Sequence, residues 1–161
     1  MVTVAPVAPA TSGAAWAAQP ARAISNGLPA VAKLLIPVIM LFALYVQFHG
    51  DYSPGGGFQA GVIFAAAIIL YALLFGLDTT MDVIAPEVLQ LLAASGVLLY
   101  AGTGVAAMLL GGDFLDYDVL AISPTEGQHL GIFLVELGVG ITVASVMLLM
   151  YYAFVGREPG Q

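Results

Sequence analysis

Phe58–Leu77, FQAGVIFAAAIILYALLFGL, is a stretch of 20 residues without a charged side chain. A bilayer core of about 30 Å needs about 20 residues of helix to cross it, so this stretch predicts a transmembrane helix. A helix also bonds its own backbone N–H and C=O groups internally, as the hydrocarbon core requires.

Three further apolar runs have the length of a membrane span. They are Val31–Phe48, Val88–Leu110 and Leu130–Val155, and they contain two charged residues, Lys33 and Glu136. The strict alternation of apolar and polar residues that is typical of membrane β-barrels is absent from these runs. The sequence therefore predicts an all-α, polytopic membrane protein with four transmembrane helices.

The composition agrees with this fold class. Of 161 residues, 61% are hydrophobic and 8% are charged, whereas soluble domains contain about 25% charged residues. The 3 Lys+Arg residues are too few to follow a phosphate backbone, which excludes nucleic acid as a partner. Without cysteine, thiolate metal sites and cysteine nucleophiles are excluded as well. Because the sequence contains no nucleophile–base pair or phosphate-binding loop, we expect no enzymatic activity, no cofactor and no metal site.

The apolar runs and the prolines predict three segments. Residues 1–29 form an Ala/Pro-rich leader that we expect to be disordered, because its prolines at positions 6, 9, 20 and 29 oppose a stable helix. Residues 30–156 form the four-helix transmembrane domain. Residues 157–161 form a short C-terminal tail.

Local signals mark where two of the helices begin. Pro86 followed by an acidic residue is typical of a first helical turn. The sequence Ser123-Pro124-Thr125-Glu126 is a capping box with proline at the first helical position. We therefore expect the third helix to begin near Pro86 and the fourth near Pro124.

The basic residues predict the orientation in the membrane. Arg22, Lys33 and Arg157 all lie near the ends of the chain, and the three connecting loops contain no basic residue. Segments rich in Lys and Arg stay in the cytoplasm, and four spans bring both ends of a chain to the same side. Both termini are therefore predicted to be cytoplasmic.

The connection between the first two runs, HGDYSPGGGF at residues 49–58, contains three consecutive glycines. Such glycines allow a sharp turn or a close approach of the backbone to another group. One interpretation is a loop that lines an ion path, with His49 and Asp51 as titratable groups at its mouth. The other is a tight interhelical turn. The loop leads into small residues at every fourth position, a spacing that allows close helix packing: Gly57, Gly61 and Ala65.

Glu136 is the acidic residue inside an apolar run, about seven residues after its start. A carboxylate at such a depth is costly and usually faces protein or water. It is either a relay group for protons or cations, or a neutral, hydrogen-bonded acid that packs against a partner.

Lys33 and Pro37 lie four residues apart in the first run. Pro37 has no N–H to donate to the carbonyl of Lys33, so a kink and a free carbonyl are expected there. The ammonium and the carbonyl could line a polar route. Alternatively, Lys33 extends to the membrane surface beside an ordinary membrane proline.

The connection between the last two runs is acidic. Its residues Asp113, Asp116 and Asp118, with Glu126, do not have the spacing of a calcium-binding EF-hand loop. They form either a mouth that attracts cations or a solvated loop.

Two motifs resemble a known family. In the first, a span ending in LYVQFHG at residues 44–50 leads to the loop motif Pro54-Gly55-Gly56-Gly57-Phe58, and Gly61 follows three residues after Phe58. In the second, Glu136 is followed by Gly138-Val139 and by Thr142-Val143. Together with the four spans, these motifs are similar to the MnhB/MrpB family of small subunits in the multisubunit Mrp (Mnh/Sha) sodium/proton antiporters, over residues 30–155. The chain departs from the family in having Ala60-Gly61 where Gly-Gly is common, and in its Pro-rich leader.

The resemblance implies a hetero-oligomeric complex in the bacterial inner (plasma) membrane that exchanges cytoplasmic Na⁺ for external H⁺. Such complexes have six or seven different subunits, and the large ones resemble the antiporter-like subunits of respiratory complex I. The MnhB-type subunit is a small companion that supports assembly and is a candidate for lining the sodium route. The expected partners are thus the other Mrp/Mnh subunits and the lipid bilayer, with Na⁺ and H⁺ as transported ions.

Two alternatives remain open at this point. The same module occurs in membrane-bound hydrogenase-type and other ion-translocating redox complexes, and a purely structural subunit would have the same spans. In an antiporter, the candidate residues for the cation or proton path are Glu136, His49, Asp51 and Lys33.

Overall fold

The computed structural model describes residues 12–50 and 55–156. Within these ranges the chain is helical, with short connections and no strand. The helices, in chain order, are α1 (Ser12–Phe48), α2 (Gly57–Phe75), α3 (Leu77–Val83), α4 (Pro86–Leu109), the 3₁₀ helix η1 (Tyr117–Leu120) and α5 (Pro124–Val155).

Four of the described helices are long and apolar enough to cross a membrane. These spans are Pro29–Phe48 within α1, all of α2, all of α4 and all of α5. The prediction of an all-α fold with four transmembrane helices is therefore confirmed. At 32 residues, α5 is about 48 Å long and exceeds the hydrocarbon core.

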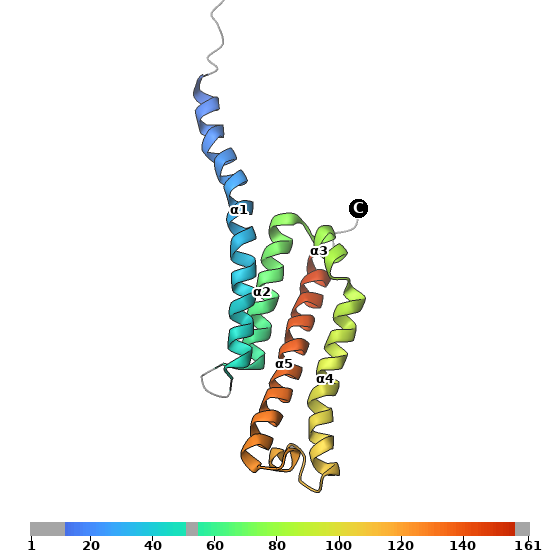
Figure 1. The fold of residues 1–161 in the computed structure, drawn as a ribbon. Helices are drawn as coiled ribbons and strands as arrows, with labels where there is room; N and C mark the ends of the chain where they lie inside the picture. The colour runs from blue at the N-terminus through green and yellow to red at the C-terminus, as the bar shows by residue number, and fades with distance from the viewer. Residues whose placement is uncertain (1–11, 51–54, 157–161) are drawn as a thin grey trace, which may run out of the picture.

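The four long helices stand in a row in the order α1, α2, α5, α4 (Figure 1). The last helix in the sequence thus lies between α2 and α4. α1 is antiparallel to α2, and α4 is antiparallel to α5, whereas α2 and α5 run in the same direction. The short α3 joins α2 to α4 at one end, and η1 lies in the α4–α5 connection at the other. The start of α1 and the end of α5 both lie on the side of the bundle on which α3 lies, as four spans require.

The leader includes the first turns of α1. α1 reaches back to Ser12, so residues 12–29 have helical backbone, although the apolar span within α1 begins at Pro29. The densest prolines, at positions 6 and 9, precede this helix and lie outside the described residues. The segment 12–28 is instead rich in alanine, which has the highest helix propensity. The C-terminal tail, residues 157–161, also lies outside the described residues.

The predicted starts of the third and fourth spans are confirmed. α4 begins at Pro86 and α5 at Pro124, each with proline in its first turn. Ser123 caps α5, because its Oγ accepts a hydrogen bond of 3.3 Å from the backbone N–H of Glu126.

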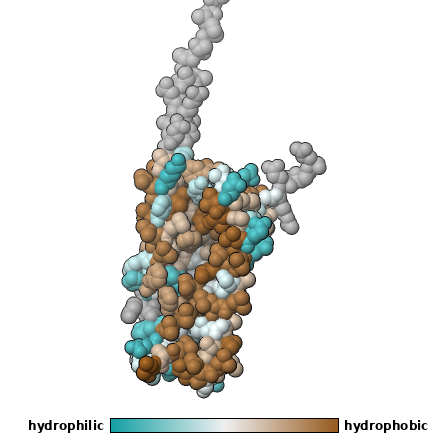
Figure 2. All heavy atoms as spheres, turned by 45° about the vertical axis from the view of Figure 1, so that its right-hand side comes forward, coloured by the Kyte–Doolittle hydropathy of each residue, from teal (hydrophilic) through white to brown (hydrophobic). Residues whose placement is uncertain are grey.

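Small residues form the contacts within the row, and large apolar side chains cover its outside. Ala65 and Ala67 are completely buried, whereas Leu91 in α4 is 70% exposed and Leu109 is 83% exposed. Figure 2 shows the visible face dominated by hydrophobic residues, with hydrophilic patches gathered toward its ends. This is the distribution that a lipid-facing surface requires.

The small-residue ridge of α2 packs against α5 of the same chain. A Cβ atom built on Gly61 would lie 2.7 Å from the carbonyl oxygen of Gly140. On the other side of α5, a Cβ atom on Gly96 would lie 2.6 Å from the carbonyl oxygen of Gly138. These glycines therefore serve packing within the subunit, since they let α2 and α4 approach α5 closely.

Candidate functional site

Glu136 lies in the middle of the row, on the side of α5 that faces α1 and α2. It follows Pro124 by 12 residues, which places it about 18 Å along α5. Its carboxylate fills the space beside the backbone of Gly50 and Gly56, at the two ends of the α1–α2 loop. A Cβ atom on Gly50 would overlap the carboxylate, and one on Gly56 would lie 2.7 Å from Oε1. The structure therefore brings together two features that lie about 80 residues apart in the sequence.

The loop glycines make this approach possible. Gly56 has φ +125°, a conformation that residues with a side chain rarely adopt. Gly57, the first residue of α2, is buried, and a Cβ atom there would overlap the backbone carbonyl oxygen of Glu136. The motif thus places the backbone of the loop and of the first turn of α2 directly against α5.

His49 lies at the end of α1, beside this contact. Its ring stacks on Tyr45 at a centroid distance of 4.1 Å, and Nδ1 lies 3.1 Å from the carbonyl oxygen of Tyr45. The neighbouring Phe48 stacks in turn on Phe133 of α5, one turn before Glu136, at 5.9 Å. His49 is half-buried, and its ring is held against α1 by this stacking. The other predicted loop residues, Asp51 and Pro54, lie outside the described residues.

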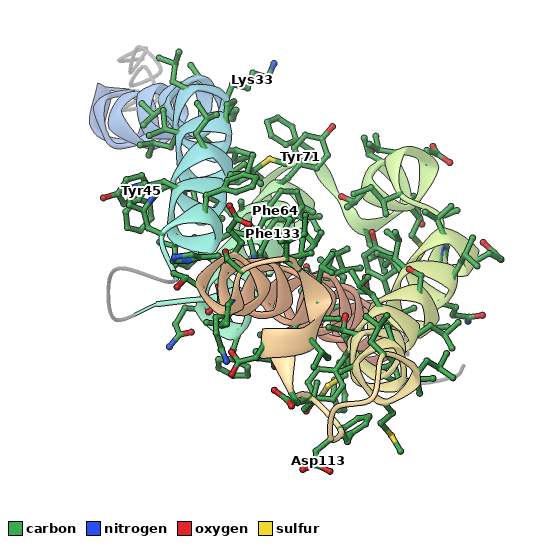
Figure 3. All side chains as sticks on the ribbon, turned by 60° about the horizontal axis from the view of Figure 1, so that its bottom comes forward. Lys33, Tyr45, Phe64, Tyr71, Asp113 and Phe133 are labelled. Atoms are coloured by element: carbon green, nitrogen blue, oxygen red, sulfur yellow. The ribbon has the colours of Figure 1, made fainter. Side chains whose placement is uncertain are left out.

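Lys33 does not belong to this cluster. It precedes Phe48, the last residue of α1, by 15 residues, about 22 Å along the helix. Its Nζ lies over the ring of Phe75, 5.5 Å from the centroid, a cation–π arrangement at the α3 end of the row. In Figure 3 Lys33 lies at the edge of the molecule, apart from Phe133 on α5. α1 continues as a helix through Pro37.

Gln47 was not singled out by the sequence analysis, yet it is a buried polar side chain of α1 that packs against α5. It is 6% exposed, and its Oε1 lies against Gly140, one turn of α5 beyond Glu136. Among the described residues, its Nε2 has no acceptor. An amide near the end of an apolar run was the signal that could have identified it, because buried polar groups in a membrane span need a partner.

The acidic α4–α5 connection folds against the ends of its two helices. Asp118 accepts a hydrogen bond of 2.8 Å from Nε2 of Gln128, and its own N–H donates to Asp116 over 3.3 Å. Tyr117 packs on Gly127 and Gly131 of α5. Burial, and secondarily the nearby Tyr100, raise the pKa of the Tyr117 hydroxyl above its ordinary value of 10.0. Asp113, labelled in Figure 3, points away from the helices. Across the described part of the chain, no three His, Asp or Glu side chains are grouped as metal ligands would be.

The fold and this cluster define a class of protein: a multi-pass membrane protein in which an acid of an apolar helix, Glu136, lies against glycine backbone at the ends of a loop. Residues 28–149 match the family described as a domain related to the MnhB subunit of the Na⁺/H⁺ antiporter. This match extends over more than half of the chain, and the chain belongs to the MnhB family.

Curated relatives of this chain include proteins from Staphylococcus aureus. The proteins of strains Newman, JH1 and COL, each named as a candidate antiporter subunit mnhB2, are 34% identical over 132 residues. The aligned region covers 80% of this chain and 93% of each relative. These names refer to an antiporter, and none of the three refers to a redox complex.

Proposed function

We propose that this chain is the MnhB-type subunit of a multisubunit Na⁺/H⁺ antiporter and works only within that complex. The family match and the near-complete coverage of the antiporter-subunit relatives support this assignment. Its partners would be the other Mnh/Mrp subunits, and its role that of a transport component rather than an enzyme. Four spans with few intramembrane polar groups offer little for a complete alternating-access path, which argues for a role beside larger subunits.

Glu136 is the residue that we propose to carry ions. Its carboxylate lies inside a span, where a charge persists only when protein or water solvates it. The backbone of Gly50 and Gly56 lies against it without a side chain between them. A carboxylate in such a place can take up a proton or bind a monovalent cation and release it again. His49 and Asp51 are the groups proposed to exchange ions with it at the loop, whereas Lys33 lies too far along α1 to take part directly.

The experiment replaces Glu136 by Gln in the complete complex and measures Na⁺-dependent proton movement in everted membrane vesicles. We expect antiport to be lost while the complex assembles at the normal level, because Gln keeps the shape but cannot ionise. Glu126→Gln is the matched control, since Glu126 is an exposed residue in the first turn of the same helix. Unchanged antiport in the Glu136→Gln complex would overturn the ion-carrying role, and loss of assembly would assign Glu136 to packing instead.

We also propose that both termini face the cytoplasm. The proposal rests on Arg22, Lys33 and Arg157, which lie toward the ends of the chain. Because the chain has no cysteine, single cysteines introduced at Asp113 and Asp82 can be labelled in intact cells by a thiol reagent that does not cross membranes. Labelling of Asp113→Cys but not of Asp82→Cys is the expected result, and the reverse pattern would invert the orientation.

A further inference from the structure

The residues at the two ends of α5 place the hydrocarbon layer along this helix. The first turn contains the exposed Glu126, and the apolar run begins at Leu130. Twenty residues later, Met150 precedes Tyr151 and Tyr152, and tyrosines gather at membrane–water interfaces. The helix rises about 30 Å between Leu130 and Met150, which is the thickness of a hydrocarbon core.

The α1–α2 hairpin does not fill the whole of this layer. α2 runs in the same direction as α5 and begins at Gly57, where a Cβ atom would overlap the backbone carbonyl oxygen of Glu136. α1 ends at Phe48, and Gly50 directly after it lies beside the carboxylate of Glu136. Because Glu136 follows Leu130 by six residues, both helices stop about 9 Å inside the layer, on the side where η1 lies.

Lipid is unsuited to cover the place where α1 and α2 stop. The backbone of Gly50 and Gly56 is not helical, and irregular backbone does not face lipid within the hydrocarbon layer, because its N–H and C=O groups would find no partner there. The half-buried His49 and the carboxylate of Glu136 lie at the same level. This part of the chain therefore needs a cover that offers hydrogen-bonding groups.

Water alone is unsuited as well, because large apolar side chains surround the same place. Phe48 is 60% exposed and stacks on Phe133 of α5, which is 36% exposed, at a centroid distance of 5.9 Å. Leu130, one turn earlier on α5, is 44% exposed. In Figure 3 Phe133 lies in the angle between α1 and α5. We call Phe48, Leu130 and Phe133 the loop shelf. Exposed aromatic and apolar side chains beside polar groups are typical of protein–protein interfaces.

We propose that the loop shelf binds a transmembrane helix of a neighbouring subunit in the complex. This helix packs apolar side chains against Phe48, Leu130 and Phe133, and it carries a hydrogen-bonding side chain at the level of the loop glycines. Lipid lacks the polar groups and water lacks the apolar surface, whereas a protein helix provides both. The inference rests on the proposed function for the kind of complex, and it places the contact between Glu136 and the loop at a subunit interface.

The test incorporates the photoreactive amino acid p-benzoylphenylalanine in place of Phe133 in the complete complex, in native membranes. After irradiation, mass spectrometry identifies what the benzophenone ring has bound. We expect an adduct with a transmembrane helix of another subunit. The same amino acid at Leu130 should bind the same helix, which keeps the test decisive if position 133 does not tolerate it. Leu98 of α4, an apolar residue that is 70% exposed at the α4 end of the row, is the matched control and should not bind that helix.

Adducts that are absent, or confined to phospholipid, to this chain or to a second copy of it, would overturn the docking surface and leave the antiporter assignment intact. An adduct with a subunit of a redox complex would support the docking surface and contradict the proposed function.

A second measurement tests the depth of the loop. The chain has no cysteine, so Glu126→Cys and Phe48→Cys can each be treated with a charged, membrane-impermeant thiol reagent in membrane fragments that are open to both sides. Glu126→Cys should be labelled and Phe48→Cys should not. Equal labelling of the two would overturn the proposal, because the end of α1 would then lie in water.

Discussion

The contact between α2 and Glu136 makes a quantitative prediction for Gly57→Ala. The added Cβ atom would overlap the backbone carbonyl oxygen of Glu136 and lie 2.7 Å from the carbonyl carbon and 3.0 Å from Cα. All three are backbone atoms, so no side-chain rotation can relieve the overlap, and α2 must move away from α5. Overpacking of this kind costs about 1–3 kcal/mol, against about 0.5–1 kcal/mol by which alanine favours a helix over glycine. For a chain of this size, each kcal/mol corresponds to a shift of about 2–4 °C in Tm.

The matched control is the same substitution at Gly102 in α4, where a Cβ atom would meet no described atom within 4 Å. The Tm of the purified complex is measured by size-exclusion chromatography of heated samples. We expect Gly57→Ala to lower it by a few degrees, and Gly102→Ala to leave it unchanged or raise it. Antiport in vesicles should fall with Gly57→Ala, because the shift moves the loop relative to the carboxylate. Equal stability of the two variants would refute the close approach of α2 to α5.

Two further predictions concern tyrosines at the ends of the row. Tyr152 is buried, and its hydroxyl donates to the carbonyl oxygen of Ile84 over 3.2 Å. Tyr152→Phe should therefore lower the Tm of the complex by several degrees, because a lost hydrogen bond that leaves a buried group unpaired costs about 1–3 kcal/mol. Tyr151→Phe is the control and should have little effect. Burial raises the pKa of the Tyr117 hydroxyl above 10.0. As the pH rises above 10, the hydroxyl therefore loses its proton more readily in the unfolded chain than in the folded chain, and the free energy of unfolding declines. Tyr117→Phe should reduce this alkaline loss of Tm, and identical pH profiles of the two proteins would contradict the assignment.

The sequence was sufficient to predict the spans, because a span depends on residues that are neighbours in the sequence. A charge-free run such as Phe58–Leu77 has few alternatives to a membrane helix, and Ser123 with Pro124 marks a helix start through its nearest neighbours. The order of the helices in the row is not local. No periodicity in the sequence indicates that α5 packs between α2 and α4, because Gly61 and Gly96 are equally suited to any close partner.

The same limit applied to the site. Glu136 was conspicuous because a carboxylate is rare in an apolar run, and the glycine loop because three glycines are unusual in succession. That the two are in contact depends on the tertiary structure, as does the burial of Gln47. A glutamine near the end of a span indicates, from sequence alone, an interfacial residue, and its burial follows only from the packing of α1 against α5.

The contact gives the two family motifs a common physical basis. A carboxylate inside a span needs polar groups close to it, and a side chain at Gly50 or Gly56 would take the space in which this carboxylate lies against the loop backbone. An acid at position 136 therefore favours glycine in the loop, and glycine in the loop leaves a space that the acid fills. The loop motif and the acid are two halves of one structural unit, although about 80 residues separate them. Substitutions in the two halves should consequently be non-additive, as expected of residues that share a contact.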